Sequence, residues 1–232
     1  MSTMTRDRRT PVRERERILR SRDRFWRAGD LAATGSTRQH LLAELVDRGE
    51  LRRVRRGLYW RGAKSPLGMA PPPTDALIAE LAPGPGVGPA GLYAANLLRL
   101  STQVPRRAQI AVPARAPESL GSIQFLARPA RSGRIRAGLN STEVAILEVL
   151  GSWESAVELP PADAWARLLE LLASGRTRPD RLARAAGTEP ASVRARLRGL
   201  LRAHGRGDLA EQVPAPDDRT TAAATRVLDT VA

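Results

Sequence analysis

Apolar residues recur at helical spacing in a short stretch near the N-terminus, and they predict a helix that ends at Gly49. The apolar stripe consists of Leu41, Leu42, Leu45 and Val46. Thr34-Gly35 predicts a turn before this helix, and Ser36 with Gln39 three residues later is a capping-box pattern. Residues 30–34 are interpreted as a short preceding helix. A helix, a tight turn and a capped helix together predict a helix-turn-helix.

A basic hairpin is predicted directly after this helix. Two short β-prone runs flank Arg55-Arg56-Gly57, in which the glycine suits a turn. The apolar members, expected to pack back on the helices, are Leu51, Val54, Leu58 and Trp60. The basic members are Arg52, Arg53, Arg55, Arg56 and Arg61. Five unpaired guanidinium groups are too costly to bury, so we expect a basic wing whose planar donors suit phosphate.

This arrangement is typical of a DNA reader. The second helix would lie in the major groove with its first turns nearest the bases. The face opposite its apolar stripe carries Thr37, His40, Ala43 and Asp47. The alternative is an ordinary α+β packing unit, in which the charged residues form a solvated face.

The chain pattern predicts an α+β protein with several parts. An N-terminal winged helix-turn-helix domain, residues 1–64, is expected to begin with a polar, disordered stretch over 1–10 and a first helix over 11–24. The arginines of that helix alternate with acidic residues, which favours a solvated face. Three consecutive prolines predict an extended, Pro-rich linker over 65–73. A mixed α/β domain over 74–155 then leads to a C-terminal helical region and tail over 156–232.

The second half shows weaker but consistent patterns. Residues 74–82, 89–100, 142–150 and 162–173 are predicted helices, and 108–113 and 122–128 are strand candidates. Ser141 or Thr142 is the expected cap of the helix over 142–150, and 151–161 a break. Residues 179–204 form a basic helix pair that suits either a second DNA module or an ordinary bundle. Residues 205–232 are expected to be a loose tail, with at most a short helix over 222–231.

Charge strengthens the DNA interpretation. The 232 residues carry a formal charge of +14. Residues 1–64 hold 18 of the 38 Lys and Arg and 8 of the 24 Asp and Glu, so +10 of that charge belongs to the predicted reader. Such an excess favours a polyanionic partner. Membrane binding is the weaker alternative, because no apolar run approaches the ~20 residues that span a bilayer. With no cysteine and no apolar export signal, the cytoplasm is the expected location.

Enzyme chemistry has no support in the sequence. There is no carboxylate pair, nucleophile constellation or metal-ligand cluster, so we expect no catalytic residues, no metal and no cofactor. His40 and His204 lie in different predicted domains and are expected to be surface side chains. Glu143 and Glu148 are interpreted as a cap and part of a solvated face. The glycines over 83–91 follow no strand, so they are not a dinucleotide fingerprint.

The order of these features in the chain resembles that of a known family, the AbiEi-type antitoxins of type IV toxin–antitoxin systems, which are also transcriptional autorepressors. The resemblance lies in GDLAATGSTRQHLLAELVDRGELRRVRRGLYW (Gly29–Trp60) and PAGLYAANLLRLSTQVP (Pro89–Pro105), with Ile123–Leu150 consistent with them. It implies a winged helix that binds double-stranded DNA at operator repeats. It also implies a C-terminal domain required to neutralise a cognate nucleotidyltransferase-like toxin.

Residue patterns and resemblance together give the expected DNA-binding set, which is Ser36, Thr37, Arg38, His40, Arg52, Arg53, Arg55, Arg56 and Tyr59. Arg38 falls toward the apolar stripe by helical angle, and only its place in the first turn makes a DNA contact tenable. The expected function is that of an autorepressor and antitoxin. The alternative is a stand-alone winged-helix regulator whose second domain binds an effector or mediates dimerisation.

Overall fold

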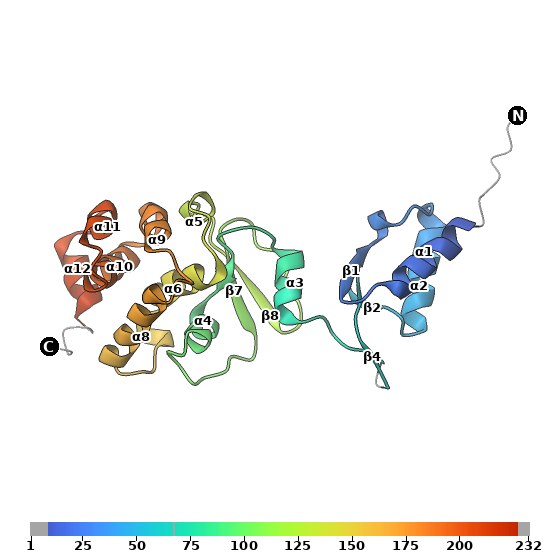
Figure 1. Cartoon of the computed structure of the whole chain (residues 1–232), viewed down its shortest axis with the longest axis horizontal. Helices are drawn as coiled ribbons and strands as arrows, with labels where there is room; N and C mark the ends of the chain where they lie inside the picture. Colours follow the sequence, from blue (N-terminus) through green and yellow to red (C-terminus); the bar gives the residue numbers. More distant parts are fainter. Residues whose placement is uncertain (1–8, 67, 227–232) are drawn as a thin grey trace, which may run out of the picture. The chain divides into compact units, whose positions relative to one another are not determined.

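The computed structural model describes residues 9–66 and 68–226, and the chain divides into two compact units, Met1–Glu80 and Leu81–Ala232 (Figure 1). Disorder was predicted for residues 1–10, of which 1–8 lie outside the described residues, as does the end of the helix predicted over 222–231. For Arg9 and Thr10 the prediction is wrong, because they belong to the first helix. Helices and strands both contribute to each unit, so the fold class is α+β as predicted.

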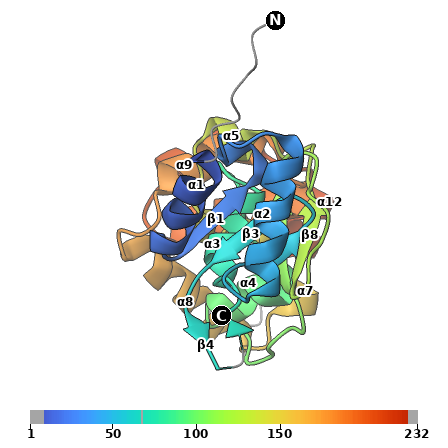
Figure 2. The same ribbon diagram turned by 90° about the vertical axis from the view of Figure 1, so that its right-hand side faces the viewer.

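The first unit contains two main helices and a three-stranded antiparallel sheet of order β1-β3-β2 (Figure 2). Its elements are α1 (Arg9–Arg20), β1 (Arg24–Arg27), the 3-10 turn η1 (Ala28–Asp30), α2 (Gly35–Asp47), β2 (Arg52–Arg55) and β3 (Leu58–Arg61). The expected hairpin is present, with Gly57 at a φ of 77° in its turn. The first helix ends at Arg20 rather than at Arg24, because Arg24 begins β1, a strand that the sequence analysis missed.

The short helix predicted over residues 30–34 is wrong. The helical turn covers Ala28–Asp30, and the chain that follows has no helical structure. Leu31 and Ala33 are buried whereas Ala32 and Thr34 are exposed, which is the two-residue alternation of an extended segment. Burial of two apolar side chains two positions apart therefore outweighs the helical tendency of this stretch.

The sheet of the first unit has two different apolar faces. Trp26 lies opposite Tyr59 and faces the helices, where it packs in a core with Ile18 and other buried side chains. That core consists of Ile18, Trp26, Leu31, Leu41, Leu42, Leu45 and Leu51. Phe25 lies opposite Trp60, and their rings are 4.7 Å apart on the other face. Leu51 thus packs on the helices as predicted, but Trp60 is buried on the far side of the sheet.

The segment predicted to be a linker contains local structure. Strand β4 (Lys64–Ser65) pairs with β5 (Gly68–Met69) as a small antiparallel hairpin. The predicted helix that follows is present as α3 (Thr74–Leu81), which spans the boundary between the two units.

The second unit begins with a small mixed sheet. Strand β6 (Gly88–Pro89) pairs antiparallel with β7 (Ala108–Val112), which pairs parallel with β8 (Ile123–Ala127). In this register Ile110 lies opposite Phe125, and both side chains are buried. Alternating β-prone residues therefore located both longer strands correctly.

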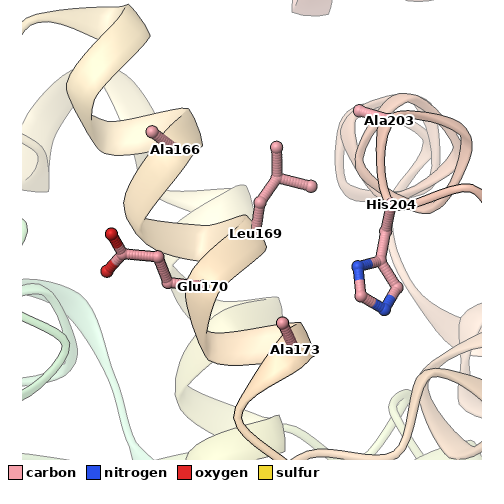
Figure 3. Close-up of a pocket in the computed structure, with 6 residues that line it drawn as sticks. All are labelled: Ala166, Leu169, Glu170, Ala173, Ala203 and His204. Atoms are coloured by element: carbon pink, nitrogen blue, oxygen red, sulfur yellow. The ribbon is translucent and has the colours of Figure 1, made fainter.

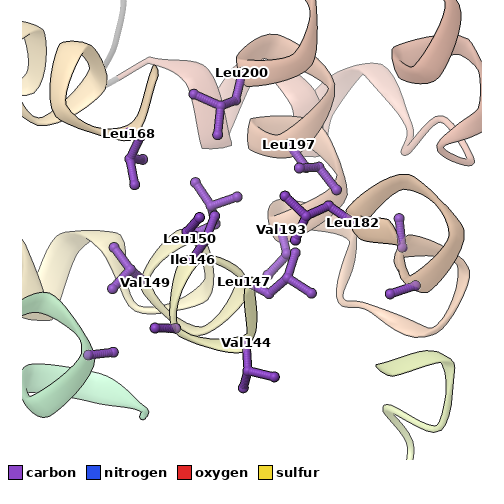
Figure 4. Close-up of a cluster of buried hydrophobic side chains, with 14 of the residues drawn as sticks. Val144, Ile146, Leu147, Val149, Leu150, Leu168, Leu182, Val193, Leu197 and Leu200 are labelled. Carbon is purple, nitrogen blue, oxygen red and sulfur yellow. The ribbon is translucent and has the colours of Figure 1, made fainter. Parts of the chain in front are cut away.

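Helices make up the rest of the second unit. They are α4 (Gly91–Leu97), α5 (Gly133–Arg136), α6 (Ser141–Gly151), α7 (Trp153–Ala156), α8 (Pro161–Ala173), α9 (Pro179–Ala185), the 3-10 turn η2 (Ala186–Thr188), α10 (Ala191–Ala203), α11 (Gly207–Gln212) and α12 (Asp218–Thr225). Every residue of α6 from Glu143 to Leu150 is buried, so this helix forms the centre of the core. Figure 4 shows its side chains facing Leu168 of α8, Leu182 of α9 and Val193 of α10.

Two expectations for the second half are wrong. The predicted break over 151–161 contains α7, whose Trp153 is buried. The predicted loose tail contains α11 and α12, which pack on α10 and bury Ala210, Val213 and Ala224. Short helices of this kind carry little periodicity of their own and are stabilised by the core that they join.

Candidate nucleic-acid interface

The N-terminal turns of α2 present polar side chains to solvent. Ser36 and His40 are exposed and Thr37 is half-buried, so these three predicted residues share the accessible part of the helix. The cap differs from the expectation, because the helix begins at Gly35 and Thr34 occupies the N-cap position. The predicted capping box of Ser36 and Gln39 is therefore wrong, which leaves the Ser36 hydroxyl outside the capping position.

Arg38 is turned toward the body of the first unit. Its guanidinium donates from Nη1 to the carbonyl oxygen of Ala28 at 2.8 Å, and its side chain is half-buried. This bond ties the first turn of α2 to η1. Arg38 is thus placed to fix the orientation of the helix, as its helical angle suggested.

The wing, defined as the β2–β3 hairpin over residues 52–61, carries guanidinium groups that lack acidic partners. Arg53 and Arg56 are exposed and Arg55 is half-buried. Across residues 9–66 and 68–226, no carboxylate forms an ion pair with any of these three arginines. The register shifts between Arg53 and Arg55, so Val54 is an extra residue that bends the strand before the turn.

Some other cations of the same unit, and Arg61 at the end of the wing, are paired with carboxylates. Glu44 pairs with both Arg15 and Arg48, at 3.3 and 2.9 Å. Glu50 pairs with Lys64 at 2.6 Å and with Arg61 at 3.6 Å. The hydrogen bond from Lys64 lowers the pKa of Glu50, so this carboxylate stays charged. Glu44 and Glu50 are therefore engaged with cations other than Arg53, Arg55 and Arg56.

Two other predicted residues have structural contacts. Arg52 is exposed but donates from Nη1 to the carbonyl oxygen of Met69 at 3.2 Å, which joins the wing to β5. Tyr59 is half-buried against the helix-facing core, opposite Trp26. Of the nine predicted residues, five are exposed, namely Ser36, His40, Arg52, Arg53 and Arg56, whereas the half-buried Arg38 and Tyr59 contact the protein itself.

Two arginines of the basic helix pair in the second unit, Arg196 and Arg198, have partners within the protein. Helix α10 packs against α6, α8, α11 and α12. Arg196 is buried and donates to the carbonyl oxygens of Leu150 and Ala224, and it also pairs with Glu154. Arg198 donates to the carbonyl oxygen of Ala210 at 2.8 Å. These arginines join helices together, which favours the ordinary bundle over a second DNA module.

A buried ion network is a further feature that the sequence analysis missed. Arg134 is fully buried and donates to Glu189 and to Glu148 Oε1, both at 2.7 Å. Glu148 was expected on a solvated face but is buried among Arg128, Arg131 and Arg134. Burial raises the pKa of Glu148, but the arginines outweigh it and hold the pKa below its ordinary value. Glu143, in contrast, is part of the cap as predicted, but the N-cap is Asn140 and not Ser141 or Thr142.

A hollow of about 430 Å³ lies between α8 and α10. It is lined by Ala166, Leu169, Glu170, Ala173, Ala203 and His204 (Figure 3). The carboxylate of Glu170 points away from the His204 imidazole and pairs with Arg167 at 2.9 Å. Glu170 and His204 are therefore not arranged as an acid–base pair.

Two properties of the structure bear on its possible ligands and surroundings. Among the residues that it describes, no three or more His, Asp or Glu side chains are grouped so that they could hold a metal ion. No helix in the same ranges is long and apolar enough to cross a membrane.

Comparisons with known proteins bear on the fold and on the first unit. The family model described as "Transcriptional regulator, AbiEi antitoxin" matches residues 15–60, which include α2 and nearly all of the wing. A comparison with curated proteins found no match. The chain is similar to the crystal structure of the RV2827C protein from Mycobacterium tuberculosis, with a TM-score of 0.51 and 21% identity over 88% of this chain and 80% of that chain. The two proteins therefore share a fold, and residues 15–60 are confirmed to match the AbiEi antitoxin family of transcriptional regulators.

Proposed function

We propose that the first unit is a winged helix that binds operator DNA, with α2 in the major groove and the wing on the phosphate backbone. One observation carries this proposal. Arg53, Arg55 and Arg56 have no acidic partner among the described residues, whereas Arg48 and Arg61 beside them do. Unneutralised arginines at a hairpin turn suit phosphate, because the guanidinium group donates two parallel hydrogen bonds to it.

Different residues serve different parts of this contact. The wing arginines supply the sequence-independent attraction, which comes from release of the counterions on DNA. Ser36, Thr37 and His40 are the residues of α2 that reach base edges. Arg38 and Tyr59 support the contact without touching DNA. Arg38 holds α2 against η1 through its hydrogen bond, and Tyr59 packs on the core that supports the sheet.

We further propose that the protein represses its own operon and neutralises a nucleotidyltransferase-like toxin through its second unit, in the cytoplasm and without enzymatic activity. The match of residues 15–60 to a family described as antitoxin regulators supports this role. The proposed organisation is a reader domain over 1–64, a linker over 65–73 and two C-terminal parts over 74–155 and 156–232. The alternative is a stand-alone regulator whose second unit binds an effector or mediates dimerisation.

The DNA contact is tested by the double variant Arg55→Ala, Arg56→Ala of the full chain. Its affinity for duplex DNA of any sequence should fall, and the slope of log K against log salt should decrease by about one per lost phosphate contact. The matched control is Arg184→Ala with Arg206→Ala, which removes the same charge from surface pairs with Asp180 and Asp208. Wild-type affinity and slope in the wing variant would refute the DNA proposal.

The antitoxin role is tested by the adjacent gene product. If that gene encodes a nucleotidyltransferase-like protein, co-expression of the full chain should restore growth and the two proteins should co-purify. Unrelieved toxicity, or a gene with no such neighbour, would instead favour the stand-alone regulator.

A further inference from the structure

Four arginines outside α2 and the wing line a single hollow on the first unit. The hollow has a volume of about 400 Å³ and is lined by Arg13, Glu16, Arg17, Arg20, Ser21 and Arg24. The arginines follow one another at intervals of four, three and four residues along α1 and into β1. Within α1, the spacing of Arg13, Arg17 and Arg20 places them on one face of the helix, although acidic residues alternate with arginines in the sequence.

Two of these guanidinium groups are held in place by an aromatic ring. Arg17 and Arg24 lie over the Trp26 indole, 5.0 and 4.7 Å from its centroid. The indole is fully buried, and its Nε1 donates to Ser21 Oγ at 3.0 Å, so the ring is fixed. Arg17 also donates to the carbonyl oxygen of Asp30. Stacking on a rigid ring orients guanidinium groups in advance of any ligand, which reduces the entropy cost of binding.

The charges in the hollow are unbalanced. Only one carboxylate lines it, that of Glu16, which is 3.8 Å from Arg20. Arg17 pairs with Glu14 at 2.8 Å, on the buried side of α1. Arg13 and Arg24 form no ion pair with any described residue. Several cations around one cavity repel one another, and a bound anion relieves that repulsion.

We propose that this arginine hollow, lined by Arg13, Arg17, Arg20 and Arg24, binds phosphate groups. The volume is within the range of small-molecule sites, so it accommodates more than a single phosphate. The ligand chemistry is a phosphoester or polyphosphate, which suits the forked donors of arginine. Two sources supply it: the backbone of DNA bound to the same unit, or a free nucleotide or polyphosphate. The site lies outside the residues on which the proposed DNA contact depends.

The first arm of the test uses sodium triphosphate as the probe and calorimetry of the full chain as the measurement. The hollow variant is Arg13→Gln with Arg20→Gln, because both side chains are exposed and the 3.8 Å pair of Arg20 with Glu16 contributes little to stability. We expect triphosphate affinity to fall at least tenfold, since charge-assisted bonds are lost. The charge-matched variants Arg184→Gln with Arg206→Gln, and Arg55→Ala with Arg56→Ala, should retain it. Equal affinity in the hollow variant and wild type, or no binding by wild type, would overturn the proposal.

The second arm identifies the source by measuring duplex DNA binding of the hollow variant as a function of salt. A salt slope reduced by about two, together with lost triphosphate binding, assigns the hollow to the DNA backbone. An unchanged slope with lost triphosphate binding assigns it to a free polyphosphate ligand. The wing variant tests the proposed DNA contact without changing any residue of the hollow. A negative result for the hollow can therefore be told apart from a negative result for the proposed function.

Discussion

Arg134 and Glu189 form a two-point ion pair in the interior of the second unit. Arg134 Nε donates to Glu189 Oε1 at 2.7 Å, and Nη2 donates to Oε2 at 2.9 Å. Both side chains are inaccessible to solvent. Arg134 also donates to Glu148 on α6, so a single guanidinium joins α5, α6 and the segment that leads into α10.

Removal of one partner should therefore destabilise the second unit strongly. In Glu189→Ala the Arg134 charge loses its two-point partner while it remains buried, and such changes cost about 3–5 kcal/mol. Asp180→Ala is the control, because its pair with Arg184 is on the surface and is worth about 0–1 kcal/mol. Hydrogen exchange of the α6 amides in urea measures the effect within this unit. Equal protection in the two variants would show that the buried pair contributes no more to the stability of the second unit than the exposed pair does.

A second prediction concerns acid and the Glu158 carboxylate. Gln103 and Ser101 donate to it, as do the backbone and hydroxyl of Thr102, and these bonds lower its pKa from 4.5 to about 2. A group whose pKa is lower in the folded state stabilises the fold above its unfolded pKa, and this contribution is lost as the carboxylate is protonated. The stability of wild type relative to Glu158→Gln should thus be constant above pH 4.5 and decrease from there toward pH 2.

Thermal unfolding of both proteins at matched pH values measures this difference. The comparison with Glu158→Gln is needed because the pKa values of Glu50 and Glu148 are also lowered, and their titration affects both proteins equally. A difference in melting temperature that stays constant from pH 6 to pH 2 would mean that the hydrogen bonds from Ser101–Gln103 do not stabilise the charged form of the Glu158 carboxylate.

Much of the first unit was predictable because its signals are local. The apolar stripe located the body of α2, and the glycine at position 57 located the turn of the wing. Each of these signals lies within a few residues of the element that it specifies. The same holds for β7 and β8, whose residue types and alternation located them without knowledge of their partners.

Features that depend on distant partners were not predictable in this way. Strand β1 exists because Trp26 pairs with Tyr59, which lies 33 residues later in the sequence. Glu148 occupies a position that suits either a solvated or a buried face, and its burial is tolerable because Arg128, Arg131 and Arg134 pair with it. The arginines of the first helix were interpreted as part of a solvated face, and the hollow that they line also includes Arg24 of β1, a strand that was not predicted.

A third prediction follows from the close approach of α5 to the chain around α9. A Cβ atom added at Gly133 would lie 2.6 Å from both the carbonyl oxygen of Ala185 and Thr188 Oγ1. The main-chain atom cannot move away cheaply, so Gly133→Ala should destabilise the second unit by about 1–3 kcal/mol. Gly187→Ala is the matched control, since nothing lies within 4 Å of its added Cβ. Chemical denaturation of the two variants compares them directly, and equal midpoints would contradict this packing argument.

The last prediction separates reading of bases from attraction to phosphate. His40 is exposed on α2 and is not part of the wing, so His40→Ala should weaken binding to the operator by about 1–3 kcal/mol and relax its sequence preference. The salt slope should stay at the wild-type value, because the proposed contact of His40 is with a base edge and not with a phosphate. Competition titrations with operator and random duplexes at several salt concentrations measure both quantities. Arg38→Ala is the contrasting variant: loss of its 2.8 Å bond to Ala28 should weaken binding to both duplexes by disturbing the docking of α2. If His40→Ala instead lowered affinity for both duplexes equally, α2 would not be the element that distinguishes sequences.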